Sequence, residues 1–155
     1  MPAIRAFRSA DQEEVRALIL AGLGQRFGHV DETVNPDLND IQTHYVEQGA
    51  SVLVVEDGED IIGCGALIRE YGSDEVARIV RVSVRANRQG EGIGRAISER
   101  LVEIAGARGF KRVLVETNDG WYSALRLYQS CGFVEYQRTR DKRFGFIEVH
   151  MQLAL

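Results

Sequence analysis

Long apolar runs are missing from this sequence of 155 residues, and cysteine is scarce. No run approaches the roughly 18 apolar residues that a membrane-spanning helix requires, and the first residues lack the apolar core of a secretory signal. The two cysteines, Cys64 and Cys131, show neither metal-ligand nor redox-pair spacing, which is typical of a reduced protein without a disulfide framework. We therefore expect a cytoplasmic protein with no membrane partner.

An excess of positive charge is also missing. The chain carries 19 basic and 23 acidic residues, a formal net charge of −4, which argues against binding to duplex nucleic acid. Arginines nevertheless gather at positions 78, 81, 85, 88 and 95. This cluster indicates either a solvent-facing sheet surface or an anion site. The length fits one domain, which we place at residues 1–155.

The spacing of the apolar residues predicts alternating strands and helices. Helices are expected at 9–24, at 35–49, after the glycine stretch near residue 93, and at 120–133; the strands lie between them. A hairpin turn is expected near Asp57 and Gly58. The resulting order is β-α-α-β-β-β-α-β-α-β-β, which predicts a mixed sheet with helices packed on it, an α/β fold of the mixed α+β kind.

The stretch "RQGEGIGRAI" places Gly90, Gly92 and Gly94 at alternate positions directly before a helix. The first N–H groups of a helix have no intrahelical partner and carry partial positive charge, so they form an anion site suited to phosphate. Arg88 and Arg95 flank the stretch and are expected to add full positive charge, whereas Glu91 must point outward. The alternative is a tight turn that needs glycine for its geometry alone.

The glycine spacing does not fit the common nucleotide motifs. The nucleoside-triphosphate loop ends in Gly-Lys-Ser/Thr, but Arg95 and Ala96 follow Gly94 here. The dinucleotide fingerprint is Gly-x-Gly-x-x-Gly, and this stretch is one residue too short. A dinucleotide-binding protein is therefore disfavoured.

Two segments together resemble the GNAT superfamily of N-acetyltransferases. "QGEGIGR", residues 89–95, is similar to the Gln/Arg-x-x-Gly-x-Gly/Ala pyrophosphate loop of that superfamily, and "ALRLYQSCGF", residues 124–133, is similar to its Ala-x-x-Leu-Tyr-x-x-x-Gly-Phe segment. The expected element order also matches, so the resemblance covers essentially the whole chain. "NPDL" before the second helix and "ETN…W" after the fifth strand resemble one subgroup. The resemblance implies a single domain whose central sheet splays between the fourth and fifth strands, where acetyl-CoA binds.

The resemblance also implies roles for individual residues. The backbone groups of Val82 and Val84 would pair with the pantetheine arm, and Tyr128 would protonate the departing CoA thiolate. The alternative for Tyr128 is packing alone, because it lies on the apolar stripe of its helix. The pyrophosphate would be held by the stretch that contains Gln89, Gly90, Gly92, Gly94 and Arg95.

Two positions depart from the family pattern. Many relatives have an asparagine where this chain has Trp121, so that Asn118 becomes the candidate for contact with the cofactor or, alternatively, for capping the next helix. Many relatives also have a glutamate as general base on the fourth strand, where this chain has Arg78, a residue that does not accept a proton.

A base is still needed because an alkylamine is mostly protonated at neutral pH. We consider Glu116, Glu70, Tyr45 or a chain of waters for this role; surface charge or core packing are the alternatives for the three side chains. The acidic residues Asp31, Glu32, Asp37 and Asp40 between the first two helices are expected either to favour a cationic acceptor or to be merely solvated.

The resemblance implies an acetyl-CoA-dependent N-acetyltransferase that acts by direct attack of a primary amine on the thioester, without a metal. The acceptor would be a small molecule or a peptide, with no nucleic acid as partner. The alternative is a non-catalytic acyl-CoA-binding sensor or partner subunit, because the glutamate of the fourth strand is missing. The sequence is compatible with a homodimer as well as with a monomer.

Overall fold

The computed structural model describes residues 2–28, 35–142 and 144–155. Within these residues the strands form one seven-stranded sheet in the order β1-β2-β3-β4-β5-β7-β6. The strands are β1 (Ala3–Ala6), β2 (Ser51–Asp57), β3 (Asp60–Arg69), β4 (Val76–Val84), β5 (Arg112–Asn118), β6 (Val134–Arg140) and β7 (Ile147–Ala154). The helices are α1 (Gln12–Phe27), α2 (Ile41–His44), α3 (Ile93–Ala107) and α4 (Tyr122–Ser130). The expected order of elements and the α/β class are confirmed.

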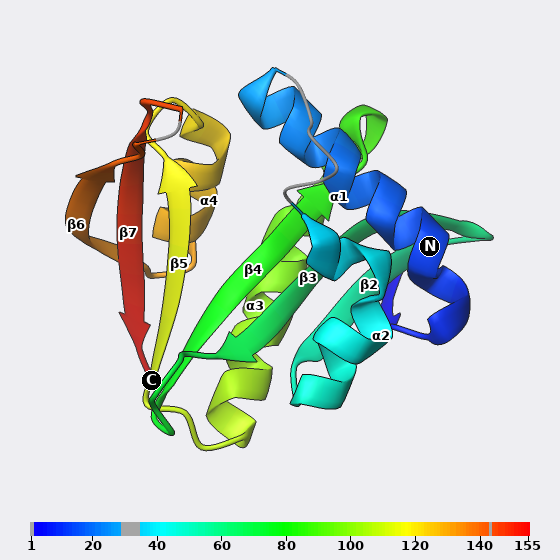
Figure 1. Ribbon diagram of the computed structural model, residues 1–155, viewed down its shortest axis with the longest axis horizontal. Coiled ribbons are helices and arrows are strands. Elements are labelled where there is room, and N and C mark those ends of the chain that lie inside the picture. The colour runs from blue at the N-terminus through cyan, green and yellow to red at the C-terminus, as the bar shows by residue number, and fades with distance from the viewer. Residues whose placement is uncertain (1, 29–34, 143) are drawn as a thin grey trace.

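The sheet opens between β4 and β5. All other neighbouring strands pair antiparallel, whereas β4 and β5 pair parallel over three residue pairs, from Val76 with Arg112 to Arg78 with Leu114. Both strands continue beyond this contact and diverge, so they meet near one end and separate toward the other (Figure 1). The splayed sheet that the resemblance implied is therefore present.

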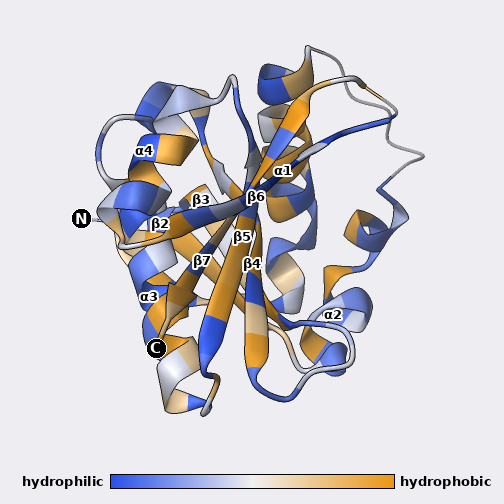
Figure 2. Ribbon diagram, turned by 90° about the vertical axis from the view of Figure 1, so that its left-hand side faces the viewer, coloured by the Kyte–Doolittle hydropathy of each residue, from blue (hydrophilic) through white to orange (hydrophobic). Residues whose placement is uncertain are grey.

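Helices cover both faces of the sheet. Helices α3 and α4 lie on one side and α1 and α2 on the other (Figure 2). On β2, Leu53 and Val55 belong to the core under α3, whereas Val52 and Val54 belong to the core under α1. Successive side chains of a strand point to opposite faces, so a strand covered on both faces reads as a continuous apolar run.

The helix expected at 35–49 is wrong as a single element. The segment consists of a 3₁₀ turn (Pro36–Asn39), the short α2 and a second 3₁₀ turn (Val46–Gln48). Asp40 interrupts the helix because its backbone is not helical, and its side chain accepts a hydrogen bond from the Thr43 N–H, as a helix N-cap does. Tyr45 ends α2 with a non-helical backbone.

None of the helices in the described part of the chain is long and apolar enough to span a membrane.

Candidate active site

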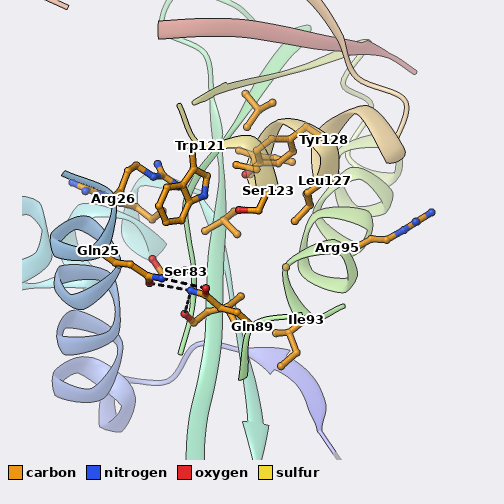
Figure 3. Close-up of a pocket in the computed structure, with 18 of the residues that line it drawn as sticks. Gln25, Arg26, Ser83, Gln89, Ile93, Arg95, Trp121, Ser123, Leu127 and Tyr128 are labelled. Atoms are coloured by element: carbon orange, nitrogen blue, oxygen red, sulfur yellow. Dashed lines mark hydrogen bonds between the residues drawn. The ribbon is translucent and has the colours of Figure 1, made fainter. Parts of the chain in front are cut away.

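A cavity of about 610 Å³ lies where β4 and β5 diverge. Its walls come from the second half of β4, the glycine stretch, the beginning of α3, one side of α4 and the end of α1 (Figure 3). Among the residues singled out from the sequence, the cavity is lined by Val82, Val84, Gln89, Gly90, Gly92, Gly94, Arg95, Glu116 and Tyr128. Asn118 lies at the end of β5 and is not among the lining residues that the structure describes. Its backbone oxygen accepts from the Trp121 N–H, and its contact with a cofactor stays a prediction.

The free edge of β4 faces this cavity. The Arg85 N–H donates to the Ile62 carbonyl of β3 at 2.8 Å. Residues of an antiparallel strand alternate between bonding to one neighbour and facing away from it. The backbone groups of Val84 therefore face the side from which β5 has departed. The Val84 carbonyl there accepts a hydrogen bond from the Gln89 side chain at 3.3 Å.

A β-bulge bends β4 next to the cavity. Cys64 pairs with Ser83 but Ala66 pairs with Val80, so β4 carries one extra residue at this point. Arg81, inside the bulge, has a φ of 59° in the left-handed region, which costs a side-chain-bearing residue free energy unless its surroundings hold it. The bulge thus turns the end of β4 away from the regular sheet.

The "NPDL" segment holds the side chain of Arg81. The guanidinium donates to Asp37 at 2.8 Å, to Asn35 at 3.2 Å and to the Tyr45 hydroxyl at 3.2 Å. The Tyr45 hydroxyl in turn donates to Asp37, and burial together with this bond raises the pKa of Tyr45. Tyr45 is thus engaged with a carboxylate and a guanidinium, so it is a poor candidate for the base.

Glycine stands at these three positions for two different structural reasons. Gly90 has a φ of 84° and Gly92 a φ of 81°, a region that residues with a Cβ rarely adopt. Gly94 lies in α3, and a Cβ there would come within 2.9 Å of the Leu127 side chain of α4. Geometry therefore explains the turn, and close packing between α3 and α4 explains the third glycine.

The same geometry exposes backbone donors. The first intrahelical bond of α3 runs from the Ala96 N–H to the Gly92 carbonyl at 3.0 Å. The N–H groups of Ile93, Gly94 and Arg95 precede it, and these residues line the cavity. The helix dipole adds partial positive charge at the same place. The beginning of α3 can therefore hold an anionic group inside the cavity.

Arg88 does not contribute the full positive charge that the sequence led us to expect. Its guanidinium donates to Glu91 at 2.8 Å and to Asp57 at 3.0 Å. The bond from Arg88 lowers the pKa of the Glu91 carboxyl and holds that carboxylate. Arg95 is exposed and pairs with Glu99 at 2.7 Å. Both arginines are therefore paired with carboxylates, and the backbone N–H groups at the beginning of α3 are the further donors at this end of the cavity.

Tyr128 is a buried residue of the cavity wall. It is 6% exposed, and its ring packs against Phe133 in an edge-to-face arrangement with centroids 5.8 Å apart. Burial raises the pKa of the Tyr128 hydroxyl to about 12, so the phenol stays protonated at neutral pH. The ring belongs to the core and the residue lines the cavity, so packing and proton donation are compatible.

Arg78 lies between the two carboxylates considered as bases. It forms ion pairs with both Glu70 and Glu116. Glu116 also has an oxygen 3.5 Å from Nδ1 of His150. Of the two carboxylates, Glu116 lines the cavity and Glu70 is not among the described lining residues. Glu116 as the base stays a prediction.

Two of the four acidic residues expected near the acceptor, Asp37 and Asp40, are engaged in other contacts. Asp37 is bound by Arg81, and Asp40 caps α2. Asp31 and Glu32 lie outside the described residues. The expectation that this segment attracts a cationic acceptor therefore has no support from Asp37 or Asp40.

Sequence reasoning missed two residues of the wall, Arg26 and Trp121. The Arg26 guanidinium lies over the Trp121 indole, 5.3 Å from the ring centroid (Figure 3). Trp121 stood in the "ETN…W" segment and could have been assigned to the site from that signal. Arg26 belongs to no motif, and its position depends on how the end of α1 lies against α4.

The family model described as "Acetyltransferase (GNAT) family" matches residues 16–133. The rat protein "N-acetyltransferase family 8 member 2" is 31% identical over 108 residues, which are 68% of this chain and 48% of that protein. The "N-acetylaspartate synthetase" of Xenopus tropicalis is 28% identical over 125 residues, 79% of this chain and 42% of that protein. The chain thus spans about half the length of these relatives or less.

Solved structures share the fold over nearly the whole chain. A GNAT-family acetyltransferase of Staphylococcus aureus Mu50 has a TM-score of 0.83 at 19% identity and covers 99% of both chains. The protein yncA of Salmonella typhimurium, solved with its cofactor acetyl-CoA, has a TM-score of 0.82 at 21% identity and covers 100% of this chain and 94% of its own. At these identities the similarity establishes the fold.

Proposed function

This chain belongs to the acetyltransferase (GNAT) family, and from that premise we propose that its cavity binds acetyl-CoA and transfers the acetyl group to a primary amine. One observation carries the proposal. The opening between β4 and β5 places a free strand edge, the unpaired beginning of α3 and a buried phenol around one cavity. The names of the relatives, N-acetyltransferases and N-acetylaspartate synthetases, agree with transfer to nitrogen.

The two ends of the donor would use different parts of the wall. The N–H groups at residues 93–95 suit the pyrophosphate, since they combine free donors with the positive end of a helix dipole. The edge of β4 at Val82 and Val84 suits the amide groups of the pantetheine arm, because exposed backbone groups need partners. Gln89 lies between the glycine stretch and the end of β4. Its side-chain amide donates hydrogen bonds to the Val84 carbonyl and to the side chain of Gln25 in α1.

The reaction needs one proton acceptor and one proton donor. The neutral amine attacks the thioester carbonyl, a C–N bond forms, the C–S bond breaks, and the products are an N-acetyl amine and free CoA. We assign Tyr128 to donate a proton to the leaving thiolate, since a phenol that stays protonated at neutral pH can do so. We assign Glu116, directly or through water, to accept the proton that the amine releases.

A second candidate function follows from Arg78. Its position matches the base of many family members, and it is paired with Glu70 and Glu116. If neither carboxylate can accept a proton while it holds the guanidinium, the chain binds acyl-CoA without turnover, as a sensor or partner subunit.

The acceptor is a small molecule or peptide that carries an amine. A cytoplasmic place of action is supported by the two unpaired cysteines, Cys64 and Cys131, and a homodimer is left open.

The test measures binding and turnover in parallel. Purified protein is titrated with acetyl-CoA by calorimetry and is then incubated with acetyl-CoA and a panel of amines, with free thiol and acetylated product as readouts. We expect binding and amine-dependent thiol release. Binding without turnover of any amine would favour the sensor, and absence of binding would overturn both functions.

A further inference from the structure

Among the residues that the structure describes, no carboxylate pairs with Arg26, which presents a cation to the cavity. Its Nε atom is buried and has no hydrogen-bond partner in the part of the chain that the structure describes. Its guanidinium stacks on Trp121, and both residues line the cavity. Arg26 lies in the last turn of α1, so this helix fixes the position of its side chain in the cavity wall.

The other arginines of the wall differ from Arg26. Three of them are paired with carboxylates: Arg81 with Asp37 at 2.8 Å, Arg88 with Asp57 at 3.0 Å and Arg95 with Glu99 at 2.7 Å. The fourth, Arg126, is exposed to solvent. Arg26 therefore combines partial burial with the lack of a carboxylate among the described residues.

Such an arrangement is costly in the unliganded protein. The residue is half-buried, and its buried Nε–H loses hydration without recovering it in a hydrogen bond to another described residue. Burial lowers the pKa of Arg26 for this reason, although an arginine stays charged at neutral pH. The indole face offers a cation–π contact of about 0.5–2 kcal/mol, but it fills none of the N–H positions of the guanidinium. An anion that enters the cavity can supply the partner that the Arg26 Nε–H lacks among the described residues.

The position of Arg26 separates this anion from the phosphates of the donor. Arg26 and Trp121 lie on one side of the cavity, and Arg95, beside the beginning of α3, lies on the other (Figure 3). Helices α1 and α3 also pack on opposite faces of the sheet (Figure 2). Arg26 lines the same cavity as Tyr128, the residue assigned to the leaving thiolate, and its charge opposes the rise that burial causes in the pKa of the Tyr128 hydroxyl. Arg26 thus belongs to the part of the cavity where the two reactants meet.

We propose that Arg26 binds a carboxylate of the acceptor, so that the substrate is a small primary amine of the amino-acid type. This inference rests on the proposed function. The planar guanidinium can bind a carboxylate with two parallel hydrogen bonds, which fixes the amine relative to the thioester. The same charge repels polyamines and other acceptors that are only cationic.

The first experiment compares matched acceptors with the intact protein and saturating acetyl-CoA. L-Phenylalanine with phenethylamine, L-methionine with 3-(methylthio)propylamine, and L-lysine with cadaverine differ within each pair by the carboxylate. We expect the amino acid to have the higher kcat/KM in each pair that reacts, by about tenfold or more. O-Phosphoethanolamine is included because a phosphate could occupy the same place.

The second experiment uses variants of Arg26 on the best pair of acceptors. Arg26→Gln is expected to raise KM for the amino acid by about tenfold or more and to leave KM for the decarboxylated amine and for acetyl-CoA within about twofold. Arg26→Lys is expected to restore part of the loss, since it keeps the charge without the planar fork. The control is Arg100→Gln, because Arg100 is exposed on α3 and pairs with Glu103 at 3.5 Å.

Distinct outcomes overturn the inference. Higher kcat/KM for the decarboxylated amines or for O-phosphoethanolamine overturns it and leaves acetyl transfer intact; this arm does not depend on the folding of any variant. A rise in KM for acetyl-CoA alone in Arg26→Gln assigns Arg26 to the donor and also overturns it. Absence of both acetyl-CoA binding and thiol release removes the proposed function and this inference with it.

Discussion

At the scale of the residue, the hydroxyl of Tyr128 can be tested apart from its ring. Tyr128→Phe keeps the contact with Phe133 and removes the proton donor. We expect kcat to fall by about 100-fold, within the range for loss of a general acid, whereas the calorimetric dissociation constant for acetyl-CoA stays within about twofold. A variant with undiminished kcat would remove Tyr128 from the mechanism.

The raised pKa of Tyr128 also makes a prediction about pH. Burial moves the pKa to about 12, so the neutral phenol persists below that value and is lost only as the pH rises through it. Between about pH 7 and about pH 10 we expect kcat/KM of the wild type to rise, because the amine becomes deprotonated and Tyr128 stays a donor. If kcat/KM of the wild type instead declines in this range, and the decline is absent in Tyr128→Phe, the phenol loses its proton at a lower pH than its burial predicts, which would contradict this prediction.

Residues within a motif were easier to assign than residues brought together by the fold. Gly92 and Tyr128 stood in recognisable patterns, and the structure places both at the cavity. The charge of Arg88 was misjudged because Asp57, which pairs with it, lies 31 positions away in the sequence. Arg26 was missed for a similar reason, since the spacing within α1 does not reveal what lies opposite its last turn.

At the scale of the element, the beginning of α3 depends on the left-handed backbone of Gly92. Gly92→Ala is expected to lower the free energy of unfolding by about 1–2 kcal/mol, the cost of the left-handed region for a residue with a Cβ. It should also weaken acetyl-CoA binding by about tenfold or more, because relief of this strain moves the donor groups. Chemical denaturation and calorimetry measure the two effects.

Gly106→Ala is the matched control, since it lies in the same helix and a Cβ there would meet nothing within 4 Å. It is expected to keep the acetyl-CoA affinity and to raise the free energy of unfolding by about 0.5–1 kcal/mol, because alanine is favoured over glycine within a helix. Equal loss of affinity in Gly92→Ala and Gly106→Ala would contradict a specific role for the turn.

The elements themselves were predicted well where periodicity is strong. The apolar stripes of α1 and α3 and the alternation on β4 gave the correct order. The segment 35–49 failed because Asp40 and Tyr45 adopt non-helical backbone conformations to serve the N-cap and the contact with Arg81. The bulge at Arg81 is invisible in the sequence, because an extra residue exists only relative to the pairing with β3.

At the scale of the whole molecule, the sheet consists of two parts that meet at the short contact between β4 and β5. The parts also touch across the open end, where Phe27 of α1 packs against Phe146, just before β7, with centroids 5.2 Å apart. The cavity lies between these two contacts. The shape of the cavity therefore depends on the whole fold. For this reason the sequence motifs predicted the acetyl donor but did not identify the amine acceptor.

The most direct test of the account is amide hydrogen exchange with and without CoA. We expect CoA to slow exchange at residues 90–95 and at residues 82–84 of β4, because both would donate to the ligand or be shielded by it. The amides of β6, none of whose residues is among the described lining residues, should keep their rates. Protection elsewhere, with unchanged exchange at the beginning of α3 and the end of β4, would contradict the central claim that the gap between β4 and β5 is the acetyl-CoA site.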